Sequence, residues 1–84
     1  MTHSDLVSIA QQADGPVYVY DASKIQSQYQ RLKNAFSGVA QLKINYACKA
    51  LSNISILKLM QNMGSGLDTV SVQEVQLGIE AGFK

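Results

Sequence analysis

Strand patterns and helix patterns alternate along the second half of this chain, and that order limits the folds open to it. Residues 41–47 and 66–70 have the composition of strands, and helical spacings of apolar residues follow at 53–63 and 71–81. Only a few residues connect one pattern to the next. Strands that are joined through helices lie parallel in one sheet. The sequence therefore predicts an α/β protein with either a doubly wound sheet or a (β/α) barrel.

Apolar stripes predict which faces of these two helices are buried. The stripe of the first helix consists of Ile56, Leu59, Met60 and Met63. The stripe of the second helix consists of Val72, Val75 and Ile79. Asn53 is the expected cap of the first helix and Ser71 that of the second. Glu74 follows Ser71 by three residues, which is the spacing of a reciprocal capping box.

The first forty residues have a helix, strand and helix pattern of their own. Residues 4–12 have the apolar spacing of a short amphipathic helix, and "VYVY" at 17–20 is typical of a strand. A second helix is expected to begin after a cap at Asp21 or Ser23 and to end near residues 37–38. We therefore expect residues 1–40 to lead into a barrel and residues 41–84 to form its first two βα units.

Composition excludes several classes of function. The 84 residues carry a net charge of +1 without a run of basic residues, which argues against nucleic-acid or anionic-membrane partners. Cys48 is the single cysteine, so an internal disulfide is impossible and a reducing compartment is expected. No apolar run approaches the roughly 20 residues that cross a bilayer, and the first residues lack the pattern of a secretory signal. A cytoplasmic protein without metal ligands is the expectation.

The strand at 41–47 carries lysines on one face. One face of the strand is apolar and consists of Leu42, Ile44, Tyr46 and Cys48. Ala47 and Lys49 lie on the opposite face, and Lys49 lies at or just past the end of the strand. Asp68 can reach the same edge from the next strand, and active sites of (β/α) barrels form at that edge. A partly desolvated lysine can form a Schiff base with an aldehyde. The alternative is a surface lysine beside a solvated aspartate.

Three segments carry a family resemblance. They are "YVYD" (18–21), "YACKALSN" (46–53) and "GSGLDTVSVQEVQLGIEAGF" (64–83). Residues 16–84 thereby resemble the N-terminal part of the diaminopimelate decarboxylases. These belong to the fold-type III pyridoxal-phosphate decarboxylases, together with the ornithine and arginine decarboxylases. The resemblance implies a (β/α)8 TIM barrel of the alanine racemase-like type, which this chain would begin but not complete.

The resemblance also implies roles for four residues. Lys49 would hold pyridoxal phosphate covalently and act in catalysis, and Ala47 would lie against the cofactor ring. Asp68 would bring a negative charge close to the lysine, and Glu74 would approach the same site as a catalytic residue. A purely structural role stays open for Asp68, and helix capping alone stays open for Glu74. Leu51 stands where the family commonly has asparagine, and Gln73 where it commonly has glycine.

The implied activity is the decarboxylation of meso-diaminopimelate to L-lysine, in lysine biosynthesis, by a cytoplasmic homodimer. The alternatives are another decarboxylase of the same type (ornithine, arginine or carboxynorspermidine), a catalytically silent regulatory relative, or a self-sufficient small binding module. The resemblance implies that the phosphate and substrate sites lie beyond Lys84. "GSG" at 64–66 is not expected to bind the phosphate, because it follows a helix C-terminus, where an anion is disfavoured. We therefore expect these residues alone to be inactive and at best marginally folded.

Overall fold

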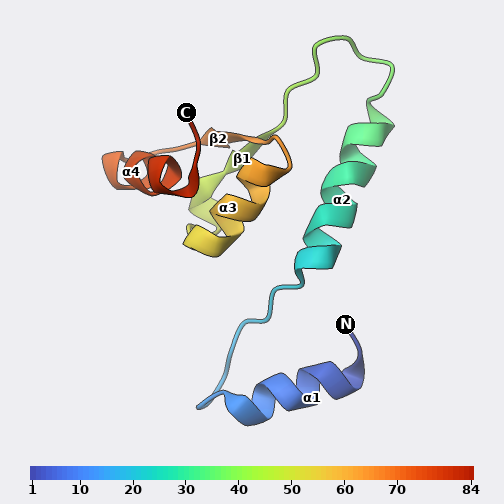
Figure 1. Cartoon of the computed structure of the whole chain (residues 1–84), viewed down its shortest axis with the longest axis vertical. Helices are drawn as coiled ribbons and strands as arrows, with labels where there is room; N and C mark the ends of the chain where they lie inside the picture. Colours follow the sequence, from blue (N-terminus) through green and yellow to red (C-terminus); the bar gives the residue numbers. More distant parts are fainter. The chain divides into compact units, whose positions relative to one another are not determined.

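The computed structural model describes every residue from Met1 to Lys84 (Figure 1). The elements are α1 (His3–Gln12), α2 (Ala22–Ala35), β1 (Asn45–Ala47), the 3-10 helix η1 (Cys48–Ala50), α3 (Ile54–Asn62), β2 (Gly66–Asp68) and α4 (Val72–Ala81). The chain forms two compact units, Met1–Gln30 and Arg31–Lys84. None of its helices has both the length and the apolar character needed to cross a bilayer. The α/β class with a parallel sheet is confirmed.

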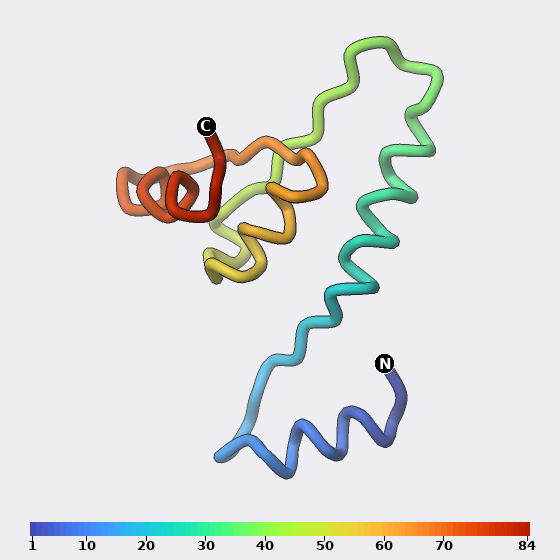
Figure 2. Tube along the Cα trace, viewed as in Figure 1, coloured from blue at the N-terminus to red at the C-terminus, as the bar shows by residue number.

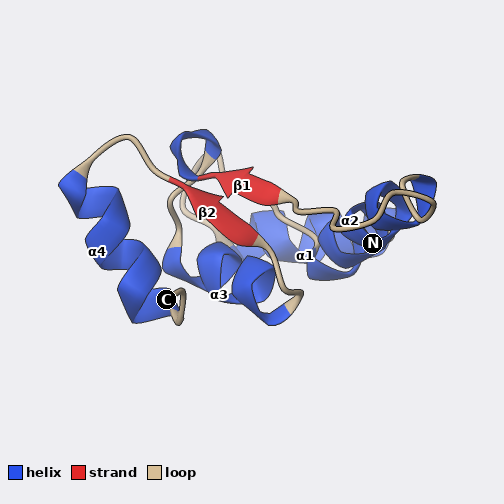
Figure 3. Ribbon diagram, turned by 90° about the horizontal axis from the view of Figure 1, so that it is seen from above, coloured by secondary structure: helices blue, strands red, loops and turns tan.

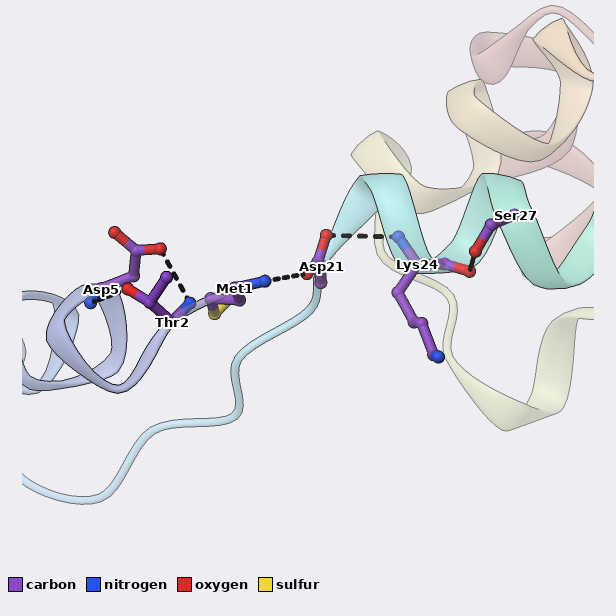
Figure 4. Close-up of polar contacts among 6 residues, drawn as sticks. All are labelled: Met1, Thr2, Asp5, Asp21, Lys24 and Ser27. Atoms are coloured by element: carbon purple, nitrogen blue, oxygen red, sulfur yellow. Dashed lines mark hydrogen bonds and ion pairs between the residues drawn. The ribbon is translucent and has the colours of Figure 1, made fainter.

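Side-chain caps define the helices of the N-terminal unit. Thr2 caps α1 through a capping box, in which the Asp5 amide donates to the Thr2 hydroxyl (3.1 Å) and the Thr2 amide donates to the Asp5 carboxylate (2.9 Å; Figure 4). The hydrogen bond from the Thr2 backbone amide lowers the pKa of the Asp5 carboxyl group, and the Thr2 side chain lowers it further. The helix predicted over residues 4–12 is confirmed.

Asp21 is the cap of α2, as one of the two expected candidates. Its Oδ1 accepts from the Lys24 amide at 3.2 Å, and its Oδ2 lies 3.3 Å from the N-terminal ammonium of Met1 (Figure 4). The hydrogen bond from Lys24 lowers the pKa of Asp21, and the ammonium lowers it further. The carboxylate therefore caps the helix down to a pH below its ordinary pKa, and the cap is lost as the pH falls through the lowered value.

The strand predicted over residues 17–20 is wrong. Figure 2 shows this segment as an extended stretch of chain between α1 and α2, and it belongs to no sheet. The Tyr18 side chain is 88% exposed. Valine and tyrosine favour extended backbone, but a strand also needs a neighbour that accepts and donates its ladder hydrogen bonds. The 17–20 segment has the preference for extended backbone, but no neighbouring strand pairs with it.

The second unit is built around two parallel strands. β1 pairs with β2 in the register Asn45 with Gly66, Tyr46 with Leu67, and Ala47 with Asp68 (Figure 3). Both strands are shorter than predicted, with three residues each. Gln41, where the first was expected to begin, has a positive φ of 62° and lies in a turn. The predicted β-α-β-α order and the parallel pairing are confirmed.

The core lies on the face of the sheet that the helices cover. Cys48, Leu57 and Ala81 are its buried centre. Half-buried apolar side chains from both strands and both helices pack around them: Tyr46, Ile54, Leu67, Leu77 and Phe83. The apolar parity predicted for Tyr46 and Cys48 is confirmed.

Helix α3 buries a different row from the one predicted. Its N-terminus is capped by Asn53, as expected, whose Oδ1 accepts from the Ser55 amide at 2.9 Å. Leu57 is fully buried and Met60 nearly so. The other predicted members, Ile56, Leu59 and Met63, are only half-buried. The helix thus turns the 57–60 row toward the strands, so its apolar surface is wider than the face that contacts them.

The apolar stripe predicted for α4 is exposed. Val72 is 69% exposed and Ile79 64%, and Val75 is also exposed. The helix instead packs through Leu77, Gly78 and Ala81, which lie against α3 and β2. β2 is the last strand of this sheet, so no further strand covers the other side of α4.

Gly78 sets how closely α4 approaches β2. A Cβ at this position would lie 2.5 Å from Cδ2 of Leu67, and Gly78 itself is buried. Gly78→Ala should raise the helix propensity of α4 by about 1 kcal/mol, yet the crowding of Leu67 should cost about 1–3 kcal/mol. We expect a lower free energy of unfolding in urea denaturation. Shortening the partner with Leu67→Val should reduce the loss, and equal losses in both backgrounds would contradict this contact.

Candidate functional site

The carboxyl ends of β1 and β2 bring two of the predicted site residues together. Ala47 and Asp68 are register partners, so their side chains lie on the same face of the sheet, opposite to the core. Neighbouring strands are about 4.8 Å apart. Ala47 is half-buried and the Asp68 side chain is exposed. A methyl group and a carboxylate therefore stand next to each other at the end of the sheet.

Lys49 lies directly past the end of β1, as predicted. It is the middle residue of η1, and its side chain is exposed. Its ammonium makes no ion pair and no hydrogen bond in the structure. The partial desolvation expected for this lysine is not provided by the 84 residues, because nothing in them covers it. The turn therefore presents a free primary amine.

Cys48 precedes Lys49 but points into the core. Its side chain is fully buried, in contact with the cluster that contains Leu57 and Ala81. Burial raises the pKa of the Cys48 thiol, and the Glu74 carboxylate raises it further. The two neighbouring reactive side chains thus face different surroundings, the thiol in the core and the amine in solvent.

Glu74 acts at the start of α4. Its backbone amide donates to the hydroxyl of the cap residue Ser71 at 3.2 Å. Its Oε1 accepts at 3.0 Å from the amide of Val70, one residue before the cap, so the predicted capping box is shifted by one position on the carboxylate side. No hydrogen bond or ion pair joins Glu74 to Lys49. The structure thus shows Glu74 in hydrogen bonds at the N-terminus of α4.

The glycine-serine loop between α3 and β2 offers no free amide to an anion. The amides of Gly64, Ser65 and Gly66 donate to the carbonyls of Gln61, Met60 and Ile44, respectively, over 2.9–3.1 Å. The Ser65 hydroxyl is buried and donates to the Gly66 carbonyl at 2.7 Å.

Asn45 is a site neighbour that the sequence analysis did not single out. It shares the face of Ala47, and its side chain occupies the space where a Cβ of Gly66 would lie. The signal was present in the alternation of the strand, since Asn45, Ala47 and Lys49 have the same parity. Glycine at 66 lets this amide lie flat across β2.

Comparison with known families gives one match over most of the chain. Residues 22–84 match the model described as "Pyridoxal-dependent decarboxylase, pyridoxal binding domain". No solved structure matches the chain.

Three similar curated proteins have the same name. A diaminopimelate decarboxylase of Methanothermobacter thermautotrophicus is 38% identical over 81 residues, which are 95% of this chain and 19% of that protein. One of Helicobacter pylori is 49% identical over 69 residues, 82% of this chain and 17% of that protein. One of Bacillus subtilis is 34% identical over 80 residues, 94% of this chain and 18% of that protein. The chain thus spans about a fifth of the length of these relatives.

Proposed function

The chain belongs to the pyridoxal-dependent decarboxylase family, and from this membership we propose that it supplies the lysine-bearing part of the cofactor site in a meso-diaminopimelate decarboxylase. The relatives' shared name supports the substrate. The observation that carries the proposal is the place of Lys49, an unpaired amine held just past the carboxyl end of a parallel strand. Lysine biosynthesis is the corresponding pathway.

The residues present fit one part of pyridoxal phosphate. An aldehyde needs a primary amine that is not engaged elsewhere, and Lys49 is exposed and unpaired. The face beside it carries the small side chain of Ala47, so a flat ring meets little obstruction there, whereas the Asn45 side chain covers the neighbouring Gly66. The phosphate has no partner in the 64–66 loop, because its three amides are already bonded. We therefore propose that residues other than this loop bind the phosphate.

Each residue has a definite task in the proposed site. Bound pyridoxal phosphate would accept the electrons of the bond that breaks when the substrate carboxylate leaves as carbon dioxide. Lys49 would hold the cofactor aldehyde through its amine, and the same amine would move protons during the reaction. Ala47 leaves room for the ring. Asp68 places a negative charge at the edge where Lys49 lies, and that charge favours a protonated nitrogen.

We propose Glu74 as a further acidic residue at the same end of the sheet. Its carboxylate is held by the Val70 amide at the start of α4, so any charge that it contributes would come from a fixed position. The topology supports this placement, because α4 begins shortly after the carboxyl end of β2. Glu74→Gln would retain the hydrogen bond to the amide and remove the charge.

The architecture proposed for the whole protein is a (β/α)8 barrel that residues 41–84 begin. The parallel β1–β2 pair, each strand followed by a helix, is consistent with it. We propose that the enzyme acts in the cytoplasm as a homodimer, to which the single, unpaired cysteine is suited. Sedimentation of the full-length protein would test the dimer.

The proposal is tested by locating the cofactor and then measuring turnover. The full-length protein is incubated with pyridoxal phosphate, reduced with borohydride and digested, and we expect the label on Lys49. Release of carbon dioxide is then measured with meso-diaminopimelate, ornithine and arginine, and we expect turnover of the first. Labelling at Lys43 or Lys58 would contradict the site. Turnover of ornithine or arginine in its place would contradict the substrate, and labelling without any turnover would indicate a silent relative.

A further inference from the structure

A tyrosine side chain closes the turn that carries Lys49. The Tyr46 hydroxyl donates a hydrogen bond of 2.8 Å to the backbone carbonyl of Leu51, across the three residues of η1. This length is typical of a well-formed hydrogen bond between two oxygen atoms. Because the bond starts before the turn and ends after it, the backbone of Lys49 lies inside a closed loop.

Few other interactions hold the η1 turn in place. Within η1 the backbone hydrogen bond is that from the Leu51 amide to the Cys48 carbonyl, at 3.2 Å. Short 3-10 segments have poorer hydrogen-bond geometry than α-helices, so this bond alone holds the turn weakly. The buried Cys48 side chain anchors the start of the turn. The hydrogen bond from the Tyr46 hydroxyl to the Leu51 carbonyl holds the end of the turn.

The tyrosine ring is itself held in place. It is half-buried and packs against the cluster of Cys48, Leu57 and Ala81, on the helix-covered face of the sheet. Ala47 lies on the opposite face, where the cofactor ring is proposed. Tyr46 can therefore act on the site only through the backbone and not by contact with the cofactor.

We propose that Tyr46 is a positioning residue, whose hydroxyl fixes the Lys49 turn so that the amine is presented at the carboxyl end of β1. This inference rests on the proposed function of Lys49. The hydrogen bond ends on a backbone carbonyl, so it does not depend on the side chain at position 51.

The test removes the hydroxyl and keeps the ring. In the full-length Tyr46→Phe variant, hydrogen exchange at the Leu51 amide, which donates to the Cys48 carbonyl, should be about tenfold faster, the change expected from one lost hydrogen bond. The rate at which Lys49 is labelled by pyridoxal phosphate and borohydride should fall severalfold per folded molecule, with little change in the unfolding midpoint. Tyr18→Phe is the matched control, because the Tyr18 side chain is 88% exposed, and both rates should match those of the unmodified protein.

The outcomes separate this inference from the proposed function. Absence of label on Lys49 in the unmodified protein would refute the proposed function. Label on Lys49 in that protein, together with unchanged exchange and labelling rates in Tyr46→Phe, would refute the positioning role alone. A fall in labelling that only follows the loss of folded protein would refute it too, since Tyr46 would then serve core packing.

Discussion

Lys49→Ala is expected to reduce turnover of meso-diaminopimelate by the full-length protein about a thousandfold or more. The substitution removes the amine that we propose binds the cofactor and moves protons during the reaction, and losses of this size follow when a covalent catalyst is removed. It should leave the unfolding midpoint almost unchanged, because the Lys49 side chain is exposed and makes no ion pair or hydrogen bond. Turnover, borohydride labelling and thermal unfolding are measured on the same preparation.

Lys43→Ala is the matched control for this experiment. Lys43 is another exposed lysine with the same parity in the 41–47 segment, but it lies before β1 and not after it. We expect both labelling and turnover to be retained in Lys43→Ala. Near-normal turnover in Lys49→Ala, or its loss in Lys43→Ala, would show that the reactive amine has been assigned to the wrong lysine.

Ala47→Leu should weaken cofactor binding, whereas Cys48→Leu should lower the stability of the fold. Ala47 lies on the open face beside Asp68, so Ala47→Leu should fill the space proposed for the cofactor ring and raise its Kd about a hundredfold, or about 2.7 kcal/mol. The fold should tolerate the larger side chain there. Cys48 is fully buried in the core, so Cys48→Leu should overpack it and lower the free energy of unfolding by about 1–3 kcal/mol.

Cofactor titration and urea denaturation distinguish the two effects. Ala47→Leu should change the titration far more than the denaturation midpoint, and Cys48→Leu should do the reverse while the folded protein still binds cofactor. Equal losses of affinity in both variants would mean that the ring does not lie on the face assigned to it. Equal losses of stability would mean that Ala47 is packed more tightly than its half-buried state indicates.

The features that were predictable from sequence are those decided within a few residues. Asp21, Asn53 and Ser71 were expected as caps, and each accepts a hydrogen bond from an amide two or three positions further along. The place of Lys49 past the end of β1 followed from the strand pattern and its parity. The parallel pairing of β1 with β2 followed from the helix between them.

The predictions that failed concern partners that lie elsewhere in space. The 17–20 segment has the composition of a strand, but that composition does not specify a neighbour. The stripe of Val72, Val75 and Ile79 is periodic, but periodicity indicates only that a face is apolar and not that another element covers it. Tyr46 was placed on the core face, whereas its hydrogen bond to Leu51 depends on the turn formed by η1 and was not predictable. Caps and the order of the elements could therefore be predicted from the sequence, whereas the burial of a helix face and the pairing of the 17–20 segment could not.

The burial of Cys48 has a consequence for chemical selectivity. Thiolates are nucleophiles that also add to aldehydes, so an exposed cysteine next to a reactive lysine could compete for the same electrophile. Here the thiol is enclosed in the core and its pKa is raised, first by burial and then by the Glu74 charge, which leaves little thiolate to react. An aldehyde that reaches the end of β1 therefore meets an amine but no competing sulfur nucleophile, and the two neighbouring positions can differ in reactivity without being separated in the sequence.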